Sequence, residues 1–488
     1  MDQIKLRETV GKLAIVLLMV ALTVSMTQRI VFDADLIRRY DKNGPRYTSY
    51  PTVAQFHDGI TEEDYRTWAR RSNGDPIPHP LSIYFHIPFC DTVCFYCACN
   101  KVVTKDHSKA EVYLQHLYRE MELQGGLFDR DRKVIQIHWG GGTPTFLDNG
   151  QMRELMQVTA KHFTLLEDDT GEYSIEIDPR SVDNEKLATL RNVGFNRLSM
   201  GVQDINPQVQ RAVNRIQPVE MTQQVIESAR KLGFRSINMD LMYGLPLQNL
   251  ESFTDTLRQT IALNPDRLAV YNYAHLPERF KPQRRINETD LPSADEKLAI
   301  LQQTIEILTA AGYVYIGMDH FARPDDELAK AQNRGTLHRN FQGYSTHAEC
   351  DLVGMGVSAI GKVCDNYCQN VRDLDSYYRK IDAGELPLDR GYELEPDDML
   401  RREIITRLIC HFVLPIEELE HKWHFSFDSH FKTEIDDLGR MQADGLLTMD
   451  GKTLQILPAG RLLVRNICMV FDSHLRSSRS GTKFSKVI

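Results

Sequence analysis

The sequence predicts an α/β fold built around a parallel sheet. Between residues 81 and 312, apolar runs of strand length alternate six times with helical patterns, an order typical of parallel strands joined by helical crossovers. Three of the predicted helices end at Gly194, Gly233 and Gly312, where a left-handed C-cap belongs. Six such units fit an open or partial barrel as well as a doubly wound sheet, so the pattern alone leaves this choice open.

The strands and helices of this core follow one another in strict order. The predicted strands are residues 81–88, 134–139, 173–178, 197–203, 237–243 and 268–273. The predicted helices are residues 108–124, 150–163, 183–193, 218–232, 250–263 and 294–311. In the first helix, apolar residues recur at the i, i+3 and i+4 spacing that places them on one face. They are Ala110, Tyr113, Leu114, Leu117 and Met121.

The segments on either side of the core have a different composition. Residues 30–80 are polar and rich in turn signals, which predicts an N-terminal arm with one short helix near 61–72 and a proline-rich linker. After residue 365 the alternation stops. Helical patterns at 397–412, 415–424, 435–447 and 458–475, with a hairpin at Asp450-Gly451, predict a mainly helical, winged-helix-like domain. The expected organisation is therefore an apolar extension at 1–29, the arm at 30–80, the α/β core at 81–365 and a C-terminal packing domain at 366–488.

The composition is that of an ordinary globular protein. The chain has 488 residues, 42% of them hydrophobic and 26% charged, which argues against disorder, a collagen-like repeat or a coiled-coil rod. The net charge is −9, so broad electrostatic binding of nucleic acid is not expected. Nine cysteines are too few for a disulfide scaffold at this length. Four of them lie within ten residues, which indicates metal or redox chemistry in a reducing compartment.

An apolar run at residues 13–26 follows three basic residues near the N-terminus. A membrane-spanning helix needs about 20 apolar residues, so this run is short for a span. It has the length of the hydrophobic part of a signal peptide, but residues 23–26 form a poor cleavage site. We favour the interpretation that the native start is Met26 and that the preceding residues are an extension. A membrane-surface anchor and an export signal are the alternatives.

Three cysteines, Cys90, Cys94 and Cys97, are spaced as CxxxCxxC directly after the first predicted strand, and Cys99 follows. Three thiolates in one compact loop can bind three irons of a [4Fe-4S] cluster and leave the fourth iron open to another ligand. Zinc is the competing interpretation, but structural zinc sites usually have a second ligand pair, and the sequence has none with convincing spacing. Reactive groups of parallel α/β folds gather at the carboxyl ends of strands, so the position of the loop favours the iron–sulfur cluster.

A glycine motif, residues 140–144 (GGGTP), follows the second predicted strand. Glycines at this position allow the backbone to approach a ligand closely, and their N–H groups are able to cradle an anion or a carboxylate. The motif is not a Walker motif, and it lacks the Rossmann spacing. One strand–helix unit separates it from the cysteine loop, and this combination is more specific than either motif alone.

Together the two motifs resemble those of the radical S-adenosylmethionine (SAM) superfamily. Longer runs are similar to one family within it, the oxygen-independent coproporphyrinogen III oxidases, also called coproporphyrinogen dehydrogenases. The resemblance extends from about residue 27 to the C-terminus. The runs that carry it are residues 45–52 (PRYTSYPT), 84–90 (YFHIPFC), 99–101 (CNK), 196–203 (NRLSMGVQ), 319–326 (DHFARPDD) and 338–344 (HRNFQGY).

The resemblance implies a fold, cofactors and site residues. The fold is expected to be a partial (β/α)6 TIM-like barrel that carries the arm and the C-terminal domain. One [4Fe-4S] cluster is expected on Cys90, Cys94 and Cys97, with one SAM molecule on its open iron and a second SAM molecule beside the first. Contacts to the cluster-bound SAM fall on Tyr84, Gly141, Glu176 and Ile360. Contacts to the second SAM fall on Tyr96, Gly142, Thr143, Gln203, Arg215, Asp240 and Ala274.

These positions also agree with elementary chemistry. Gly141, Glu176, Gln203, Asp240 and Ala274 lie at or near the ends of five predicted strands, which a barrel mouth brings together. Asp240 is able to accept hydrogen bonds from ribose hydroxyls or an amino group, and Arg215 to pair with a methionyl carboxylate. Taken singly, a helix cap for Asp240 and a surface charge for Arg215 are the alternatives.

Cys99 has a separate role in this resemblance. It is implied to be required for activity without binding the cluster, because a fourth thiolate would close the open iron. The related haem chaperones resemble this family in CxxxCxxC but lack this cysteine. The alternative for Cys99 is a core thiol without a chemical role.

The reaction implied is a step of haem biosynthesis, the oxidative decarboxylation of two propionates of coproporphyrinogen III to vinyl groups. The expected protein is a cytoplasmic monomer that takes electrons from a reductant such as flavodoxin or ferredoxin and binds no nucleic acid. Four propionates require arginine or lysine in an otherwise apolar pocket. The candidates are Arg46, Arg323 and Arg339, with Tyr47 and Tyr50 stacking on the macrocycle or lining its entrance. A haem chaperone on the same scaffold and a zinc-stabilised module that binds nucleic acid are the alternative functions.

Overall fold

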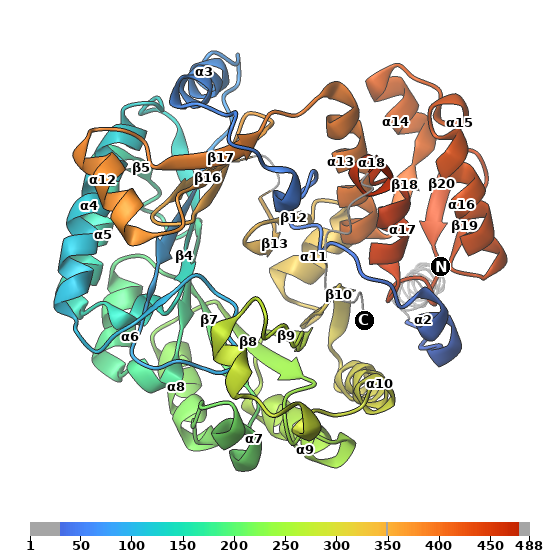
Figure 1. Ribbon diagram of the computed structural model, residues 1–488, viewed down its shortest axis with the longest axis horizontal. Helices are drawn as coiled ribbons and strands as arrows, with labels where there is room; N and C mark the ends of the chain where they lie inside the picture. The colour runs from blue at the N-terminus through green and yellow to red at the C-terminus, as the bar shows by residue number, and fades with distance from the viewer. Residues whose placement is uncertain (1–29, 348–349, 478–488) are drawn as a thin grey trace, which may run out of the picture.

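The computed structural model describes residues 30–347 and 350–477. Its centre is a strongly curved sheet with helices outside it, and the C-terminal domain lies at one side of the sheet's opening (Figure 1). The apolar run at 13–26 lies outside the described residues. Within the described ranges, no helix is long and apolar enough to cross a membrane.

Seven parallel strands form the sheet's core. Six are the predicted strands: β1 (Leu81–Ile87), β4 (Lys133–Gly141), β6 (Glu172–Ile177), β7 (Arg197–Gln203), β8 (Ser236–Tyr243) and β9 (Arg267–Asn272). They pair in the order β9-β8-β7-β6-β4-β1, so strands that are successive along the core are neighbours in space. The seventh, β14 (Asp351–Met355), pairs in parallel with β1. The sequence did not predict it, because a hairpin rather than a helix precedes it.

Antiparallel strands extend both edges and leave the barrel open. Beyond β9 lie β11 (His320–Ala322) and β10 (Val314–Gly317), and beyond β14 lie β15 (Ile360–Val363), β16 (Asn366–Asn370) and β17 (Leu388–Tyr392). The sheet thus continues past residue 365, where the sequence pattern placed the end of the α/β core. The pattern misses this continuation because antiparallel neighbours need no helical crossover.

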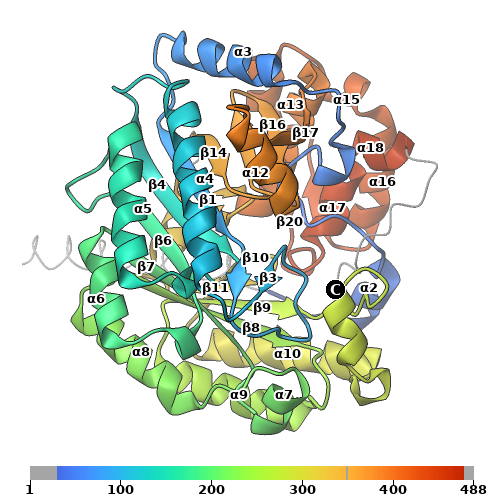
Figure 2. The ribbon, with the colours of Figure 1, turned by 60° about the vertical axis from the view of Figure 1, so that its left-hand side comes forward.

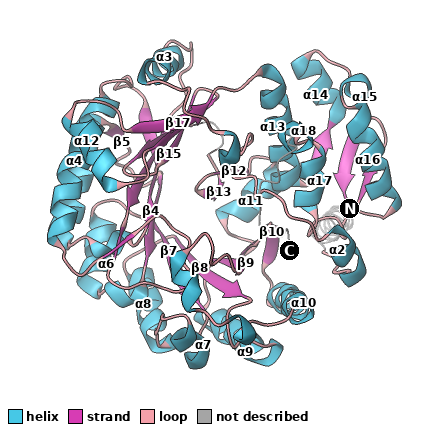
Figure 3. Ribbon diagram, in the orientation of Figure 1, coloured by secondary structure: helices cyan, strands magenta, loops and turns pink. Residues whose placement is uncertain are grey.

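A helix covers the outer face after each of the six predicted strands (Figures 2 and 3). These helices are α4 (Ser108–Gly125), α5 (Asn149–His162), α6 (Asn184–Asn192), α8 (Val219–Lys231), α9 (Leu250–Leu263) and α10 (Ala294–Ala310), with a short α7 (Pro207–Ala212) before α8. Gly194, Gly233 and Gly312 have the positive φ angles predicted from the sequence. An Asp148 capping box starts α5, since its side chain accepts from the Gln151 N–H and the Gln151 side chain returns to the Asp148 N–H.

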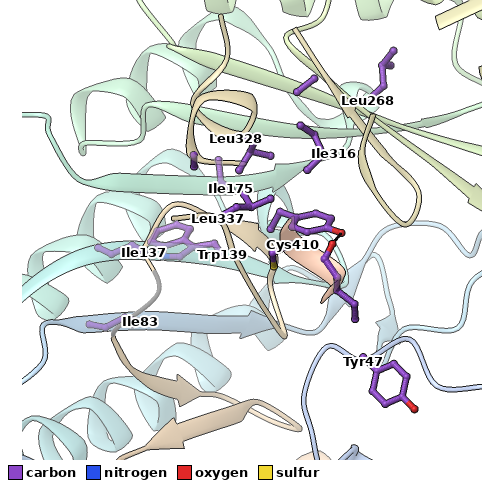
Figure 4. Close-up of a cluster of buried hydrophobic side chains, with 14 of the residues drawn as sticks. Tyr47, Ile83, Ile137, Trp139, Ile175, Leu268, Ile316, Leu328, Leu337 and Cys410 are labelled. Atoms are coloured by element: carbon purple, nitrogen blue, oxygen red, sulfur yellow. Dashed lines mark hydrogen bonds between the residues drawn. The ribbon is translucent and has the colours of Figure 1, made fainter. Parts of the chain in front are cut away.

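The alternation of side chains along each strand separates an apolar outer face from a polar inner face. Ile83 of β1 lies opposite Ile137 of β4, and Trp139 of β4 opposite Ile175 of β6. All four are buried in the main hydrophobic core (Figure 4). The neighbouring positions point inward and are polar or aromatic, because successive side chains of a strand point to opposite faces.

The arm and the C-terminal domain pack against each other. The arm has two helices, α2 (Ala34–Tyr40) and α3 (Glu62–Asn73), of which the sequence predicted only the second. The C-terminal helices are α12 (Leu374–Asp382), α13 (Pro396–His411), α14 (Ile416–Trp423), α15 (Phe427–His430), α16 (Lys432–Ala443), α17 (Val464–Val470) and α18 (Ser473–Ser477). A small sheet of β18 (Val413–Pro415), β20 (Thr453–Ile456) and β19 (Leu447–Met449) completes the helix–hairpin–helix order that the sequence predicted. Arg465 joins the two parts, because its guanidinium donates to the carbonyls of Gly44 and Pro45.

Candidate active site

A cavity of about 410 Å³ lies at the carboxyl ends of β1, β4, β6, β7 and β8. It gathers all but three of the predicted site residues. They are Cys90, Cys94, Cys97, Cys99, Tyr96, Gly141, Gly142, Thr143, Glu176, Gln203, Arg215 and Asp240. Parallel strands bring their carboxyl ends to one edge, which explains why residues up to 150 positions apart meet here.

The three remaining predicted residues line adjoining cavities. Tyr84 and Ile360 line a cavity of about 330 Å³, which shares Cys99, Gly141 and Glu176 with the first. Ala274 lines a separate cavity of about 570 Å³ between the end of β9 and the arm. Hydrogen bonds from Gln283 connect Ala274 to the cysteine loop. The Gln283 side-chain amide donates to the carbonyl of Tyr96 at 3.0 Å and to that of Ala274 at 3.3 Å.

Backbone contacts hold the cysteine loop at the end of β1. Strand β2 (Phe89–Cys90) pairs with β3 (Val102–Val103) and closes the loop between them. The Phe95 N–H donates to the Val213 carbonyl at 3.0 Å, and the Asn214 amide donates to the Val93 carbonyl at 2.8 Å. The loop is therefore anchored to the turn that follows α7.

Donor groups surround the buried sulfurs. Cys90 and Cys94 are each 8% exposed. The Thr143 hydroxyl donates to Cys90 Sγ at 3.4 Å, and the guanidiniums of Arg215 and Arg180 donate to Cys94 Sγ at 3.6 and 3.7 Å. These groups place hydrogen-bond donors and positive charge beside the sulfurs, as a site for anionic thiolate ligands requires. The sequence analysis did not predict Arg180. Its position after the third predicted strand was the available signal, because other residues of the site also follow the ends of predicted strands.

The cysteine thiols differ in their acidity. A hydrogen bond from Cys99, supported by the nearby Lys101 ammonium, lowers the pKa of Cys97 to about 5, whereas burial raises the pKa of Cys90 to about 11. Within the described ranges, no three Cys, His, Asp or Glu side chains converge as ligands of a single metal ion do. A four-iron cluster binds its thiolates through different irons, so the loop fits such a cluster without that convergence.

The glycine motif at the end of β4 allows the backbone to lie against the end of β1. A Cβ on Gly141, whose φ is +113°, would lie 2.8 Å from the His86 ring, and one on Gly142 would lie 2.7 Å from Pro88. Only glycine fits both positions. The Gly141 N–H donates to the Glu176 carboxylate, and the N–H groups of Gly142 and Thr143 donate to the carbonyls of Ile87 and Phe89, so these three donors already have partners within the chain.

Arg215 and Gln203 both line the cavity of about 410 Å³. Arg215 is only 6% exposed, which rules out the surface-charge alternative. It donates to Asp178 at 3.0 Å and to the Gly201 carbonyl, and these bonds hold its guanidinium beside Cys94. Gln203 has a left-handed backbone with φ of +70°, and its side-chain Oε1 is buried without a hydrogen-bond partner among the described residues. A buried polar atom of this kind fits a site that a ligand completes.

Asp240 lies inside β8, so the helix-cap alternative is wrong. Its carboxylate accepts from the Asn238 amide at 2.8 Å and from the Ser199 hydroxyl at 3.3 Å. Burial raises its pKa to about 7, since removal from water disfavours the charged form. The cavity thus holds a carboxylate that changes charge near neutral pH.

Two histidines that the sequence analysis did not single out support Tyr84. The Tyr84 ring stacks on His138 with ring centres 5.9 Å apart, and its hydroxyl hydrogen-bonds to His86 Nδ1 at 3.1 Å. The other nitrogen of His86 contacts the Asn100 carbonyl at 2.9 Å, next to Cys99. His86 is two residues from Tyr84 on the same strand, so the two side chains share a face. This spacing could have identified His86 from the sequence.

Most of the predicted propionate ligands have other partners. Arg46 pairs with Asp319 at 2.6 Å, and Arg323 donates to the Pro265 carbonyl at 3.4 Å and covers the Tyr313 ring. Tyr47 and Tyr50 are 4% and 2% exposed, and their hydroxyls bond to Asp472 and Ser473 of the C-terminal domain. Tyr47 is therefore held against the C-terminal domain, whereas Tyr50 also lines a neighbouring cavity of about 650 Å³. Of the three arginines, Arg339 has guanidinium nitrogens, Nε and Nη1, that are buried without a hydrogen-bond partner in the part of the chain that the structure describes.

Comparison with known proteins agrees with this geometry. Residues 84–260 match the model of the Radical SAM superfamily, and residues 394–463 match that of the HemN C-terminal domain. The oxygen-independent coproporphyrinogen III oxidase of Pseudomonas aeruginosa is 55% identical over 463 residues, 95% of this chain and 100% of that protein. The Escherichia coli K12 protein of the same name is 49% identical over 461 residues, 94% and 99% of the two chains.

A solved structure shows the same similarity in three dimensions. The coproporphyrinogen III oxidase (HemN) from Escherichia coli, described as a radical SAM enzyme, superposes with a TM-score of 0.87 at 48% identity and covers 92% of this chain and 100% of its own. A sequence identity of this size over nearly the whole length, together with the cysteine loop and the glycine turn at one barrel mouth, leads to one conclusion. The chain belongs to the family of oxygen-independent coproporphyrinogen III oxidases, within the radical SAM superfamily.

Proposed function

We propose that this protein is a coproporphyrinogen III dehydrogenase that works without oxygen, converting two propionates of its substrate to vinyl groups and giving protoporphyrinogen IX. The observation that supports this most is the cavity in which the CxxxCxxC loop meets Gly141, Glu176, Gln203 and Asp240. The names of the family members supply the substrate.

Three thiolates, Cys90, Cys94 and Cys97, would hold a [4Fe-4S] cluster whose fourth iron takes SAM. Tyr84, Gly141, Glu176 and Ile360 would hold this SAM molecule. The second SAM molecule would contact Tyr96, Gly142, Thr143, Gln203, Arg215, Asp240 and Ala274. The unsatisfied Gln203 Oε1 and the guanidinium of Arg215 beside Cys94 fit polar, charged ligands.

A bound, reduced cluster and SAM supply a carbon radical, which is strong enough to take hydrogen from an unactivated C–H bond that no general base can attack. The chain's own residues orient the reactants and exclude water. Glu176 lines both adjoining cavities, and the Tyr84–His138 stack lines the one of about 330 Å³. Arg215, fixed by Asp178, keeps a positive charge beside the cluster loop.

Each propionate would lose one hydrogen atom from its β-carbon, then carbon dioxide, while one electron passes to an external acceptor. The product is a vinyl group, and a second round converts the second propionate. Cys99 would act in this reaction without binding the cluster; it is exposed and lines both cavities. We further propose a cytoplasmic monomer that is reduced by flavodoxin or ferredoxin and binds no nucleic acid.

The test is anaerobic reconstitution followed by turnover. Iron and sulfide are measured first, with about four of each expected per chain. The reconstituted protein is then given dithionite, SAM and coproporphyrinogen III, and protoporphyrinogen IX and 5′-deoxyadenosine are quantified by chromatography. A cluster capped by four protein thiolates, or no cleavage of SAM, would contradict the proposal. Haem binding without decarboxylation would identify a haem chaperone, and one zinc without iron a zinc-stabilised module.

A further inference from the structure

A chamber of about 650 Å³ lies next to the SAM cavities, between the sheet and the C-terminal domain. Its walls come from β12 (His338–Asn340), β14, β15, α13 and the arm. Polar and apolar groups are mixed in these walls. Arg339, Lys362 and Arg402 face apolar side chains that include Phe341, Leu352 and Met399. No role assigned so far uses this chamber.

The chamber continues the inner surface of the SAM site. On β15, Ile360 lines the cavity of Tyr84, and Lys362 lines the chamber. Residues two apart on a strand share a face and lie about 6–7 Å apart. Strand β1 shows the same continuity, since Tyr84 lines the SAM-side cavity and Ser82 the chamber. Phe341 and Leu352 line both spaces, so the two cavities adjoin there.

Three of the four acidic residues in the chamber walls have cationic partners. Asp351 accepts from Arg132 at 2.6 Å, and Asp365 accepts from Arg402. Glu403 pairs with Lys422 at 2.9 Å and with Arg407 at 3.0 Å. These three carboxylates are therefore engaged, and the fourth, Asp75, is exposed and accepts from the Ile77 N–H.

Three cations of the chamber walls have no carboxylate partner among the described residues: Lys362 and Arg339, which are half-buried, and Arg71, which is exposed. Among the described residues, Lys362 and Arg339 form no ion pair and no hydrogen bond through their charged groups. Nε and Nη1 of Arg339 are buried without a partner, and its guanidinium lies 4.7 Å from the centre of the Tyr344 ring. Burial lowers the pKa of Lys362. A wall that holds half-buried cations without a carboxylate partner among the described residues is suited to an anionic ligand.

We propose that Lys362 and Arg339 bind the carboxylates of substrate propionates that are not reacting, while a reacting propionate reaches the SAM side past Phe341 and Leu352. This inference rests on the proposed function and names the residues that recognise its substrate. The guanidinium of Arg339 suits a carboxylate bidentately, and Lys362 supplies a point charge. The apolar walls suit the pyrrole rings.

The first test measures binding to the reconstituted holoenzyme under anaerobic conditions. The probe is coproporphyrin III, the stable oxidised form of the substrate, followed by its fluorescence. Lys362→Met and Arg339→Leu are each expected to weaken binding by about 10- to 100-fold, the usual effect of losing a charge-assisted hydrogen bond. Lys362→Arg keeps the charge and is expected to remain within a few-fold of the wild type. Lys422→Met is the matched control, because this exposed rim lysine is already paired with Glu403.

The second test separates binding from chemistry. Both loss-of-charge variants should raise KM for coproporphyrinogen III more than they lower kcat, with unchanged iron content and unchanged cleavage of SAM without substrate. Wild-type affinity for the coproporphyrin tetramethyl ester, which lacks the charges, should fall to the level of the variants. The proposal is overturned if ester and free acid bind equally, or if both variants bind the free acid like the wild type.

Failure of the chamber and failure of the proposed function give different results. If the wild type forms protoporphyrinogen IX and both variants are unimpaired, the proposed carboxylate site is rejected and the proposed reaction is kept. Charge-dependent binding of the probe through Lys362 and Arg339, with no product from the wild type, removes the reaction and supports the carboxylate site.

Discussion

The two faces of the central sheet differ in what they contribute, although the same strands supply both. On β1 and β4, Ile83 lies opposite Ile137 on the outer face, and the next pair, Tyr84 and His138, lies on the inner face. The outer pair is fully buried under helices, whereas the inner pair lines a cavity. A shift of one residue in register would exchange the two sets. Stability and chemistry are therefore separable by single substitutions on adjacent residues.

Replacing a cysteine of the loop should have the largest effect on activity. Cys94→Ala removes a proposed iron ligand, so the cluster and product formation should fall below detection. Cys410→Ala, in the fully buried core of α13, is the matched control and should keep iron content and turnover with a modest loss of thermal stability. Iron analysis and the turnover assay check both. A Cys94→Ala protein that retains a stable cluster and cleaves SAM would show that the loop does not ligate it.

Truncating an outer-face residue should have the largest effect on stability. Ile137→Ala is expected to lower the free energy of unfolding by about 2–5 kcal/mol, because it leaves a cavity in a packed core. His138→Ala, one residue away on the inner face, should cost less stability but weaken SAM binding, because Tyr84 loses its stacking partner. Chemical denaturation and equilibrium dialysis with SAM measure the two effects. The distinction between the faces fails if His138→Ala proves the more destabilising of the two.

Asp240→Asn should raise the stability of the folded protein at alkaline pH and weaken its binding of SAM. Burial raises the pKa of Asp240 to about 7, so the folded protein holds this proton more tightly than the unfolded chain. The wild type therefore loses stability as pH rises from about 4 to about 7. The variant avoids this loss and should melt at a higher temperature than the wild type at pH 8, with little difference at pH 4.

The same substitution should change the pH dependence of SAM binding. If ionised Asp240 accepts hydrogen bonds from SAM, wild-type affinity should rise as pH increases through 7, and Asp240→Asn should be weaker and flatter. Isothermal titration of the apoprotein and holoprotein with SAM between pH 6 and 8 measures this. Equal affinity and an identical pH profile in both proteins would remove Asp240 from the site.

Glu120→Gln should give the smallest effect of this kind. Glu120 of α4 is fully buried and accepts from the Gly356 N–H at 2.7 Å, the Tyr377 hydroxyl at 2.6 Å and the Asn370 amide at 2.8 Å. Burial raises its pKa to about 7, so it too costs stability as pH rises from about 4.5 to about 7. Glutamine removes the charge but places one donor against Asn370, which limits the gain. Melting curves at pH 5 and pH 8 should show a smaller pH effect in the variant than in the wild type.

Local patterns were sufficient for much of the fold and most of the site. The six predicted strands and their helices are present because periods of 2 and 3.6 residues depend only on which side chains must be buried. The cysteine loop and the glycine turn were predictable because their spacing is contained in a few residues. Even the gathering of Glu176, Gln203 and Asp240 followed from their places at the ends of parallel strands.

The sequence alone determined the alternating core, the cysteine loop and the gathering of strand-end residues at one edge of the sheet. Only the tertiary structure decided that β14 joins β1, that Arg46 and Arg323 have other partners, that Tyr47 is buried, and that Lys362 faces a chamber next to the SAM site. The physical reason is the distance along the chain over which each interaction acts. Periodicity acts within one element, but the partner of a charge or a hydroxyl is set by packing between segments that lie hundreds of residues apart.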